Sequence, residues 1–145
     1  TMIAIGSNHI GYLIKENIIN WLYENDINVI DFGPDSPDIE VDYPDYAHAV
    51  AGSIIDEESI FGILICEDGN GMSISANKWM GIRASVCWDI QSAIMSKSNN
   101  NSNIICLPAN FINSEDAVRI VETFLSTEIN SKYIDTLSKV NPNMF

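Results

Sequence analysis

The sequence predicts an α/β fold with a parallel sheet of five strands, because two kinds of segment alternate along the chain. Short apolar runs, which are typical of buried strands, are each followed by a segment with the apolar spacing of an amphipathic helix. Strands separated by helices pair in parallel through right-handed crossovers. A length of 145 residues suits one domain with one core, spanning residues 1–145.

Turn residues mark the limits of the expected strands. The first strand ends at the polar turn Ser7-Asn8-His9, and the second ends at a loop of glycine, proline and aspartate at 33–38. The last strand follows a loop of serine and asparagine at 98–103. The expected strands are residues 2–6, 27–32, 60–65, 82–86 and 104–107.

Helical periodicity and capping residues predict the helices. In the first helix, apolar residues from Leu13 to Leu22 recur on one face. Pro44 suits the first turn of the second helix. Ser114 is the expected N-cap of the last long helix, because two acidic residues, which are favourable near a helix N-terminus, follow it. The expected helices are residues 12–25, 42–55, 73–79, 89–98 and 114–125, with another short helix in the tail, 126–145.

The chain is strongly acidic, with 20 acidic and 7 basic residues and a formal net charge of −13. This charge excludes nucleic acid and anionic membrane surfaces as partners, because both require basic surfaces. Neither a transmembrane span nor a secretory signal pattern is visible. The three cysteines, Cys66, Cys87 and Cys106, lack metal-ligand spacing, so we expect reduced thiols, a cytoplasmic protein and no metal.

The most informative stretch is residues 66–73, Cys-Glu-Asp-Gly-Asn-Gly-Met-Ser, which directly follow the third expected strand. Open α/β sheets bind ligands at the carboxyl ends of strands, and glycine turns before a helix suit anions. A helix N-terminus lowers the pKa of a thiol, whereas nearby carboxylates such as Glu67 and Asp68 raise it. Cys66 is therefore a candidate base or nucleophile; the alternative is a small apolar residue that ends a strand.

Other polar turns follow the strand ends at 7–9, 88–89 and 108–110, and a parallel sheet brings such turns to one edge. We interpret His9 as a functional residue because an imidazole exchanges protons near neutral pH, although it could instead cap the next helix. His48 lies within a predicted helix, where a surface or packing histidine is favoured. The other two cysteines lie within apolar strands and are interpreted as core residues.

Six segments of the chain carry a specific combined pattern, namely residues 3–12, 29–33, 41–47, 62–66, 69–78 and 81–84. Together they resemble the ribose-5-phosphate isomerase B family, which also includes the galactose-6-phosphate isomerase subunits. The resemblance implies a Rossmann-like three-layer α/β/α sandwich that needs no cofactor or metal. It also implies a homodimer with active sites at the subunit interface, where the tail would lie; a tetramer is the alternative.

The family's reaction is the isomerisation of ribose 5-phosphate to ribulose 5-phosphate through a cis-enediolate. By resemblance, Cys66 moves the proton between C1 and C2, and N–H groups of the glycine loop stabilise the enediolate. Asn99 is expected at the ring oxygen, from the partner subunit, and Asp68 is a candidate auxiliary acid. The residues expected to bind the sugar are Asn8, His9, Tyr43, Glu67, Gly69, Asn70, Gly71, Met72, Ser73, Asn100 and Lys132.

The chain departs from the family's usual pattern at its site. The family reads Asp-His at Asn8-His9, and Cys-Gly-Thr-Gly at the segment 66–69. Asn99 replaces the ring-opening histidine, and an amide cannot deliver a proton at neutral pH. Asn110 replaces an arginine, and Lys132 stands where the tail usually has arginines, so the bidentate grip on phosphate is lost.

Three functions remain open, of which ribose 5-phosphate isomerisation leads. The alternatives are an isomerase for a different sugar, phosphorylated or not, and a catalytically inactive sugar-binding homologue. Glu67 and Asp68 favour a ligand rich in hydroxyl groups, because a carboxylate accepts hydrogen bonds from them. Retention of Cys66 and the glycine loop favours surviving catalysis.

Overall fold

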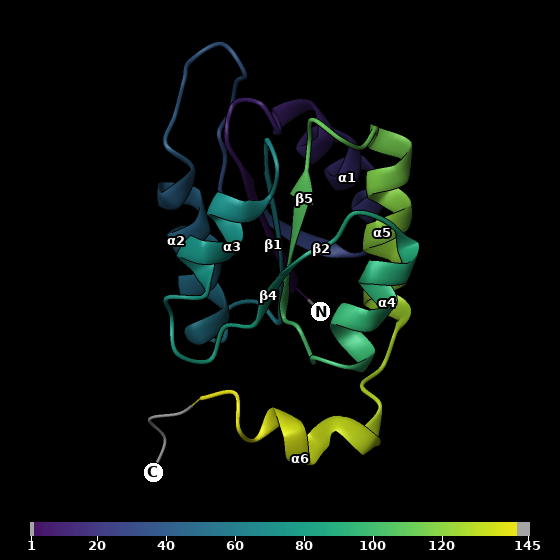
Figure 1. Cartoon of the computed structure of the whole chain (residues 1–145). Helices are drawn as coiled ribbons and strands as arrows, with labels where there is room; N and C mark the ends of the chain where they lie inside the picture. The colour runs from purple at the N-terminus through teal and green to yellow at the C-terminus, as the bar shows by residue number, and fades with distance from the viewer. Residues whose placement is uncertain (1, 142–145) are drawn as a thin grey trace.

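The computed structural model describes residues 2–141 as a five-stranded parallel sheet with helices on both faces (Figure 1). The predicted Rossmann-like α/β/α sandwich is therefore confirmed. The strands are β1 (Met2–Ser7), β2 (Asn28–Asp31), β3 (Phe61–Cys66), β4 (Ala84–Val86) and β5 (Ile104–Pro108). The α-helices are α1 (Tyr12–Glu24), α2 (Tyr43–Ile55), α3 (Asn70–Ala76), α4 (Ile90–Ser98), α5 (Ser114–Ser126) and α6 (Ile134–Leu137), with a 3₁₀ turn at Ser131–Tyr133.

The strands lie in the order β2-β1-β3-β5-β4, and every neighbouring pair is parallel. The chain moves outward from β1 to β2 and then returns to β3 on the other side of β1. The gap between β1 and β3 is therefore a topological switch point, where α/β sheets form a binding crevice at the carboxyl ends of the strands. The register pairs Ser7 with Ile65 and Cys66 with Pro108, so three strands end at this crevice.

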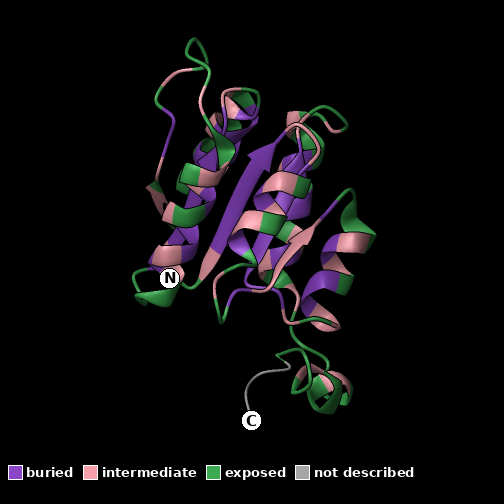
Figure 2. Cartoon of the chain, turned by 60° about the vertical axis from the view of Figure 1, so that its left-hand side comes forward, coloured by how far each residue is buried: buried purple, intermediate pink, exposed green. Residues whose placement is uncertain are grey.

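The sheet separates two apolar cores. Figure 1 shows α2 and α3 on one face and α1, α4 and α5 on the other. Because side chains alternate along a strand, Ile3 and Ile63 pack under α1 and α5, whereas Ala4, Leu64 and Cys66 pack under α2 and α3. Figure 2 shows the buried centre of the sheet between the two helical layers. The Cys66 side chain thus belongs to the α2–α3 face.

The start of α3 and the N-cap of α5 differ from the predictions. Helix α3 begins at Asn70 rather than Ser73, because Gly69 adopts a φ of 81° and turns the chain directly from β3 into the helix. The prediction of Ser114 as an N-cap is wrong: the side chain of Asn113 accepts the N–H of Asp116 and caps α5.

The tail after α5 lies beyond the amino ends of the strands, below the sheet in Figure 1. The short helix predicted there is confirmed as the 3₁₀ turn and α6, and residues 142–145 of the predicted tail lie outside the described residues. Ile134 and Val140 are each 54% exposed. None of the helices within residues 2–141 is long and apolar enough to cross a membrane.

Candidate active site

Cys66 ends β3 at the crevice, and only 1% of the residue is exposed. Burial raises the pKa of its thiol, and backbone N–H groups of Met72 and Gly69 that hydrogen-bond the sulfur oppose this rise. The carboxylates of Glu67 and Asp68 raise the same pKa further. The lowering expected from the start of α3 is therefore outweighed, and the thiol is protonated near neutral pH.

The segment from Cys66 to Ser73, hereafter the site loop, requires glycine at two positions. Gly69 has a positive φ, and a Cβ there would lie 3.2 Å from Cγ1 of Val86. Gly71 lies against the ring of Tyr43, the first residue of α2, so a Cβ on Gly71 would lie 2.5 Å from two ring carbons. The structure thus brings Tyr43 to the site loop, as the resemblance implies.

Polar side chains of the site loop mainly bond within the protein. Asp68 Oδ1 accepts the N–H of Asn70 at 2.9 Å, which forms the turn into α3. Ser73 Oγ donates to the carbonyl of Ala84 at 3.3 Å, and the Met72 side chain is buried in the core. No three His, Cys, Asp or Glu side chains within residues 2–141 are grouped so that they could hold a metal ion.

Asn8 and Glu67 form a hydrogen-bonded pair across the switch point. Asn8 Nδ2 donates to Glu67 Oε1 at 2.5 Å, and Asn8 Oδ1 accepts the N–H of Gly11 at 3.1 Å. Only 2% of the Asn8 surface is exposed, so little of this residue is accessible to a sugar. Its geometry fits a positioning role, since it holds the partly exposed carboxylate of Glu67 beside Cys66.

His9 follows Asn8 at the same edge of the sheet, and its imidazole is hydrogen-bonded by the backbone of the loop that precedes α2. Nδ1 of His9 accepts the N–H of Val41 at 3.2 Å. This bond leaves the proton of the neutral ring on Nε2, which can therefore donate to a ligand. His48, in contrast, is exposed on α2 and accepts a hydrogen bond from Nε1 of Trp79 at 2.8 Å, as expected of a surface or packing histidine.

Asn99, Asn100 and Lys132 do not reach this crevice within one chain. Asn99 caps the C-terminus of α4, and Asn100 follows it before the amino end of β5. Lys132 lies in the 3₁₀ turn of the tail. Cys66 pairs with Pro108 at the far end of the five-residue strand β5, so about 16 Å of sheet separates the two groups.

An aromatic pair that the sequence pattern did not reveal lies beside the site loop. Trp88 follows β4, Phe111 follows β5, and their ring centroids are 4.9 Å apart. The rings remain largely open to solvent, since Trp88 is 45% and Phe111 64% exposed. A tryptophan directly after a strand at the ligand-binding edge was the available signal, but its partner comes from the tertiary structure.

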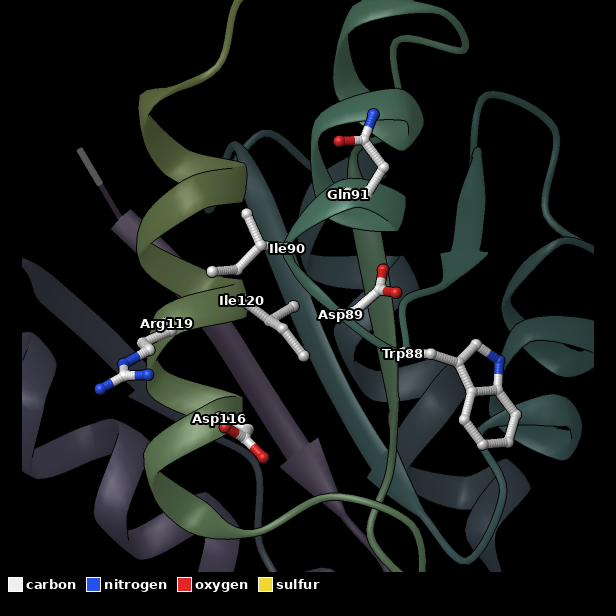
Figure 3. A pocket seen from close by; sticks show the side chains of 7 residues that line it. All are labelled: Trp88, Asp89, Ile90, Gln91, Asp116, Arg119 and Ile120. Carbon is white, nitrogen blue, oxygen red and sulfur yellow. The ribbon is translucent and has the colours of Figure 1, made fainter.

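A hollow of about 360 Å³ lies between α4 and α5 (Figure 3). In Figure 3, Ile90 and Ile120 face its centre, and the ring of Trp88 turns away from α5. Because α4 and α5 cover the face opposite the one on which Cys66 packs, most of the hollow lies on the other side of the sheet from the Cys66 side chain, and Trp88 stands at its edge. Its lining residues are Trp88, Asp89, Ile90, Gln91, Asp116, Arg119 and Ile120.

This chain is similar to known proteins in both sequence and fold. A family model described as Ribose/Galactose Isomerase matches residues 3–140. The chain belongs to the ribose/galactose isomerase family. The resemblance drawn from the sequence is therefore confirmed, and the protein is a sugar isomerase by family.

Individual members of the ribose/galactose isomerase family match over nearly the whole chain. Ribose-5-phosphate isomerase B of Escherichia coli is 40% identical over 126 residues, which cover 87% of this chain and 84% of that protein. The ribose 5-phosphate isomerase structure from Thermotoga maritima has a TM-score of 0.94 at 43% identity and covers 97% of both chains. Ribose-5-phosphate isomerase B of Mycoplasma genitalium, solved with bound ribulose 5-phosphate, has a TM-score of 0.91 at 31% identity and covers 96% of this chain and 93% of its own.

Proposed function

We propose that this isomerase interconverts an aldose and a ketose through a cis-enediolate with Cys66 as the base, and that ribose 5-phosphate and ribulose 5-phosphate are the leading pair. The observation that carries the proposal is the position of Cys66 at the switch point, next to a carboxylate that Asn8 holds. Backbone N–H groups bonded to the sulfur would stabilise the thiolate that proton abstraction requires.

In the proposed reaction, the Cys66 thiolate removes the proton from C2 of the open-chain aldose. The C–H electrons form the C1–C2 double bond, and the carbonyl oxygen becomes an enediolate oxygen. The N–H of Gly71, to which the start of α3 supplies no partner, is placed to stabilise that charge, an effect of about 3 kcal/mol. The thiol then returns its proton to C1, and Glu67 or Asp68 transfers the hydroxyl proton from O2 to O1.

A second copy of the chain would complete this site. Asn99, Asn100 and Lys132 lie at the opposite end of the sheet, so they reach a sugar above Cys66 only from another subunit. The exposed apolar side chains of the tail are the kind of surface that an interface buries. We therefore propose a homodimer in which Asn99 and Asn100 of one subunit contact the ring oxygen and hydroxyl groups of sugar bound at the other.

The charges at the crevice favour an unphosphorylated aldose as a second candidate substrate. Glu67 and Asp68 stand beside Cys66, and like charges repel a phosphate. Two lysines are occupied elsewhere: buried Lys15 binds Asp31 at 3.0 Å, and buried Lys97 donates to the carbonyl of Phe124 at 3.1 Å.

A coupled assay on ribose 5-phosphate and a panel of free aldoses tests these proposals. Cys66→Ala should abolish turnover, and Cys87→Ala, which removes a buried thiol from the opposite face, is the matched control that should retain it. Unchanged turnover in Cys66→Ala would refute the base assignment. Absence of turnover on every sugar would support the inactive sugar-binding homologue instead.

A further inference from the structure

We propose that Trp88 and Phe111 form an aromatic wall of the substrate crevice, which packs against the carbon skeleton of an unphosphorylated aldose. This role rests on the proposed isomerase function, and it assigns the residues that select the substrate class.

Main-chain hydrogen bonds place the aromatic wall next to the site loop. The N–H of Asn110, the residue before Phe111, donates to the carbonyl of Glu67 at 2.9 Å. The N–H of Cys87, the residue before Trp88, donates to the carbonyl of Cys106 at 3.0 Å, which continues the β4–β5 pairing to the strand ends. Gly69 of the site loop lies over these same strands, because a Cβ there would sit 3.4 Å from the Cys106 carbonyl oxygen. The wall therefore borders the site loop.

The chemistry of the wall and of the neighbouring loop suits a neutral sugar. An aromatic ring offers an apolar face against which the C–H groups of a sugar can pack, and ligand pockets combine such faces with a few placed polar groups. Here those polar groups are the carboxylates of Glu67 and Asp68, which accept hydrogen bonds from hydroxyl groups. Both rings are exposed in the single chain, so their surfaces are available to a ligand.

Most basic side chains within residues 2–141 lie away from the wall. Arg83 donates to the carbonyls of Asn101 and Gly81, near the amino ends of the strands. Arg119 lines the same hollow as Trp88, but its guanidinium pairs with Glu115 at 2.8 Å, and in Figure 3 it points away from the Trp88 ring. The remaining lysines follow α3 or lie in the tail, at positions Lys78, Lys132 and Lys139. Within residues 2–141 of the same chain, a phosphate at the wall would therefore meet carboxylates, and the nearby cation Arg119 is already paired with Glu115.

Tryptophan fluorescence gives a direct readout of the wall. The chain has three tryptophans, so a Trp21→Phe, Trp79→Phe variant leaves Trp88 as the single emitter. Titration with ribose and with ribitol, which lacks the carbonyl and cannot isomerise, should produce a saturable change in Trp88 emission. Phe111→Ala in this background should raise Kd for ribitol roughly tenfold, or about 1.4 kcal/mol. Phe111→Tyr, which keeps a ring, should restore binding.

Activity measurements separate the wall from other roles. Trp88→Ala and Phe111→Ala should each raise KM for free aldoses roughly tenfold with a smaller change in kcat. Tyr23→Ala, which removes an equally exposed ring (62%) from the opposite end of the sheet, should leave KM unchanged. Unchanged KM and Kd in the two wall variants would overturn the proposal, as would an effect confined to the oligomeric state in sedimentation.

The phosphate alternative has its own signature. Tighter binding of ribose 5-phosphate than of ribose, lost in Lys132→Ala or Arg119→Ala, would show that a cation grips the substrate and would overturn the wall's proposed selectivity. If no sugar is turned over but ribitol binding still depends on Trp88 and Phe111, the isomerase function fails and the wall stands. Absence of both turnover and sugar binding would overturn both proposals.

Discussion

Replacing Gly71 with alanine should move the ring of Tyr43 and the start of α3 relative to Cys66. A Cβ on Gly71 would lie 2.5 Å from two ring carbons, whereas ordinary contact begins near 3.4 Å, so ring or backbone must shift by nearly 1 Å. Misplacement of reacting groups by about 1 Å can cost a hundredfold in rate. We therefore expect kcat/KM to fall about a hundredfold, or about 2.7 kcal/mol, in the coupled isomerase assay.

Two further variants show whether the clash itself is the cause. Gly52→Ala is the matched control, because its Cβ would meet the ring of Trp79 at an ordinary 3.4 Å, and alanine favours the helix by up to about 1 kcal/mol. This variant should keep full activity and gain stability against denaturant. In a Tyr43→Ala background, Gly71→Ala should cost much less than alone. A wild-type rate for Gly71→Ala, or an equal loss without the Tyr43 ring, would refute the reasoning.

Three other outcomes follow from the titratable and paired groups. Burial raises the pKa of Cys66 above the ordinary 9.0, and the proposed base must be a thiolate. We therefore expect kcat/KM to be still increasing with pH at about pH 9. A pH profile of kcat/KM that is flat from about pH 7 upward would contradict the base role. Burial also raises the pKa of Cys87 to about 11, so its stabilising contribution is complete below about pH 9 and lost as the pH rises to about 11. The free energy of unfolding should fall by about 2 kcal/mol over that range, and less in Cys87→Val. Asn8→Asp should place a second carboxylate next to Glu67 and lower the free energy of unfolding by about 1–3 kcal/mol in denaturant titrations. Adding Glu67→Gly to this variant should recover most of the lost stability. If the effects of the two substitutions simply add, the pair is not coupled.

The order and type of the elements were predictable because strands buried on both faces read as continuous apolar runs. The run at 60–65 corresponds to β3, Phe61–Cys66, within one residue at each end. The position of β5 between β3 and β4 was not predictable, since it depends on how α3 and α4 pack on opposite faces rather than on any local signal. The early start of α3 was missed because its N-cap, Gly69, works through backbone conformation and carries no capping side chain.

The candidate site was predictable where it is contiguous in sequence. Cys66 and its glycines form one segment whose position after a strand indicates a ligand site. The hydrogen bond from Val41 to His9 and the pairing of Trp88 with Phe111 join segments that approach each other only in the folded chain. Neither the spacing nor the residue types specify those partners.

The pairing of Asn8 with Glu67 bears on whether the chain has kept a catalytic site. In the family pattern that the sequence resembles, aspartate and glycine stand at these two positions. In this structure, Oε1 of Glu67 lies 2.5 Å from Nδ2 of Asn8. An aspartate at position 8 would therefore place a second carboxylate close to Glu67, and the two like charges would repel each other. A glycine at position 67 would leave that buried amide without this partner, at a cost of about 1–3 kcal/mol.

Each of these two changes is therefore less costly in the presence of the other, although the positions lie 59 residues apart. Together they keep one carboxylate at the crevice and move it from the end of β1 to the end of β3. Loss of function without constraint would not replace the lost carboxylate and at the same time give the new buried amide a hydrogen-bond partner. The pair therefore favours an isomerase whose substrate has changed over a homologue that has lost catalysis.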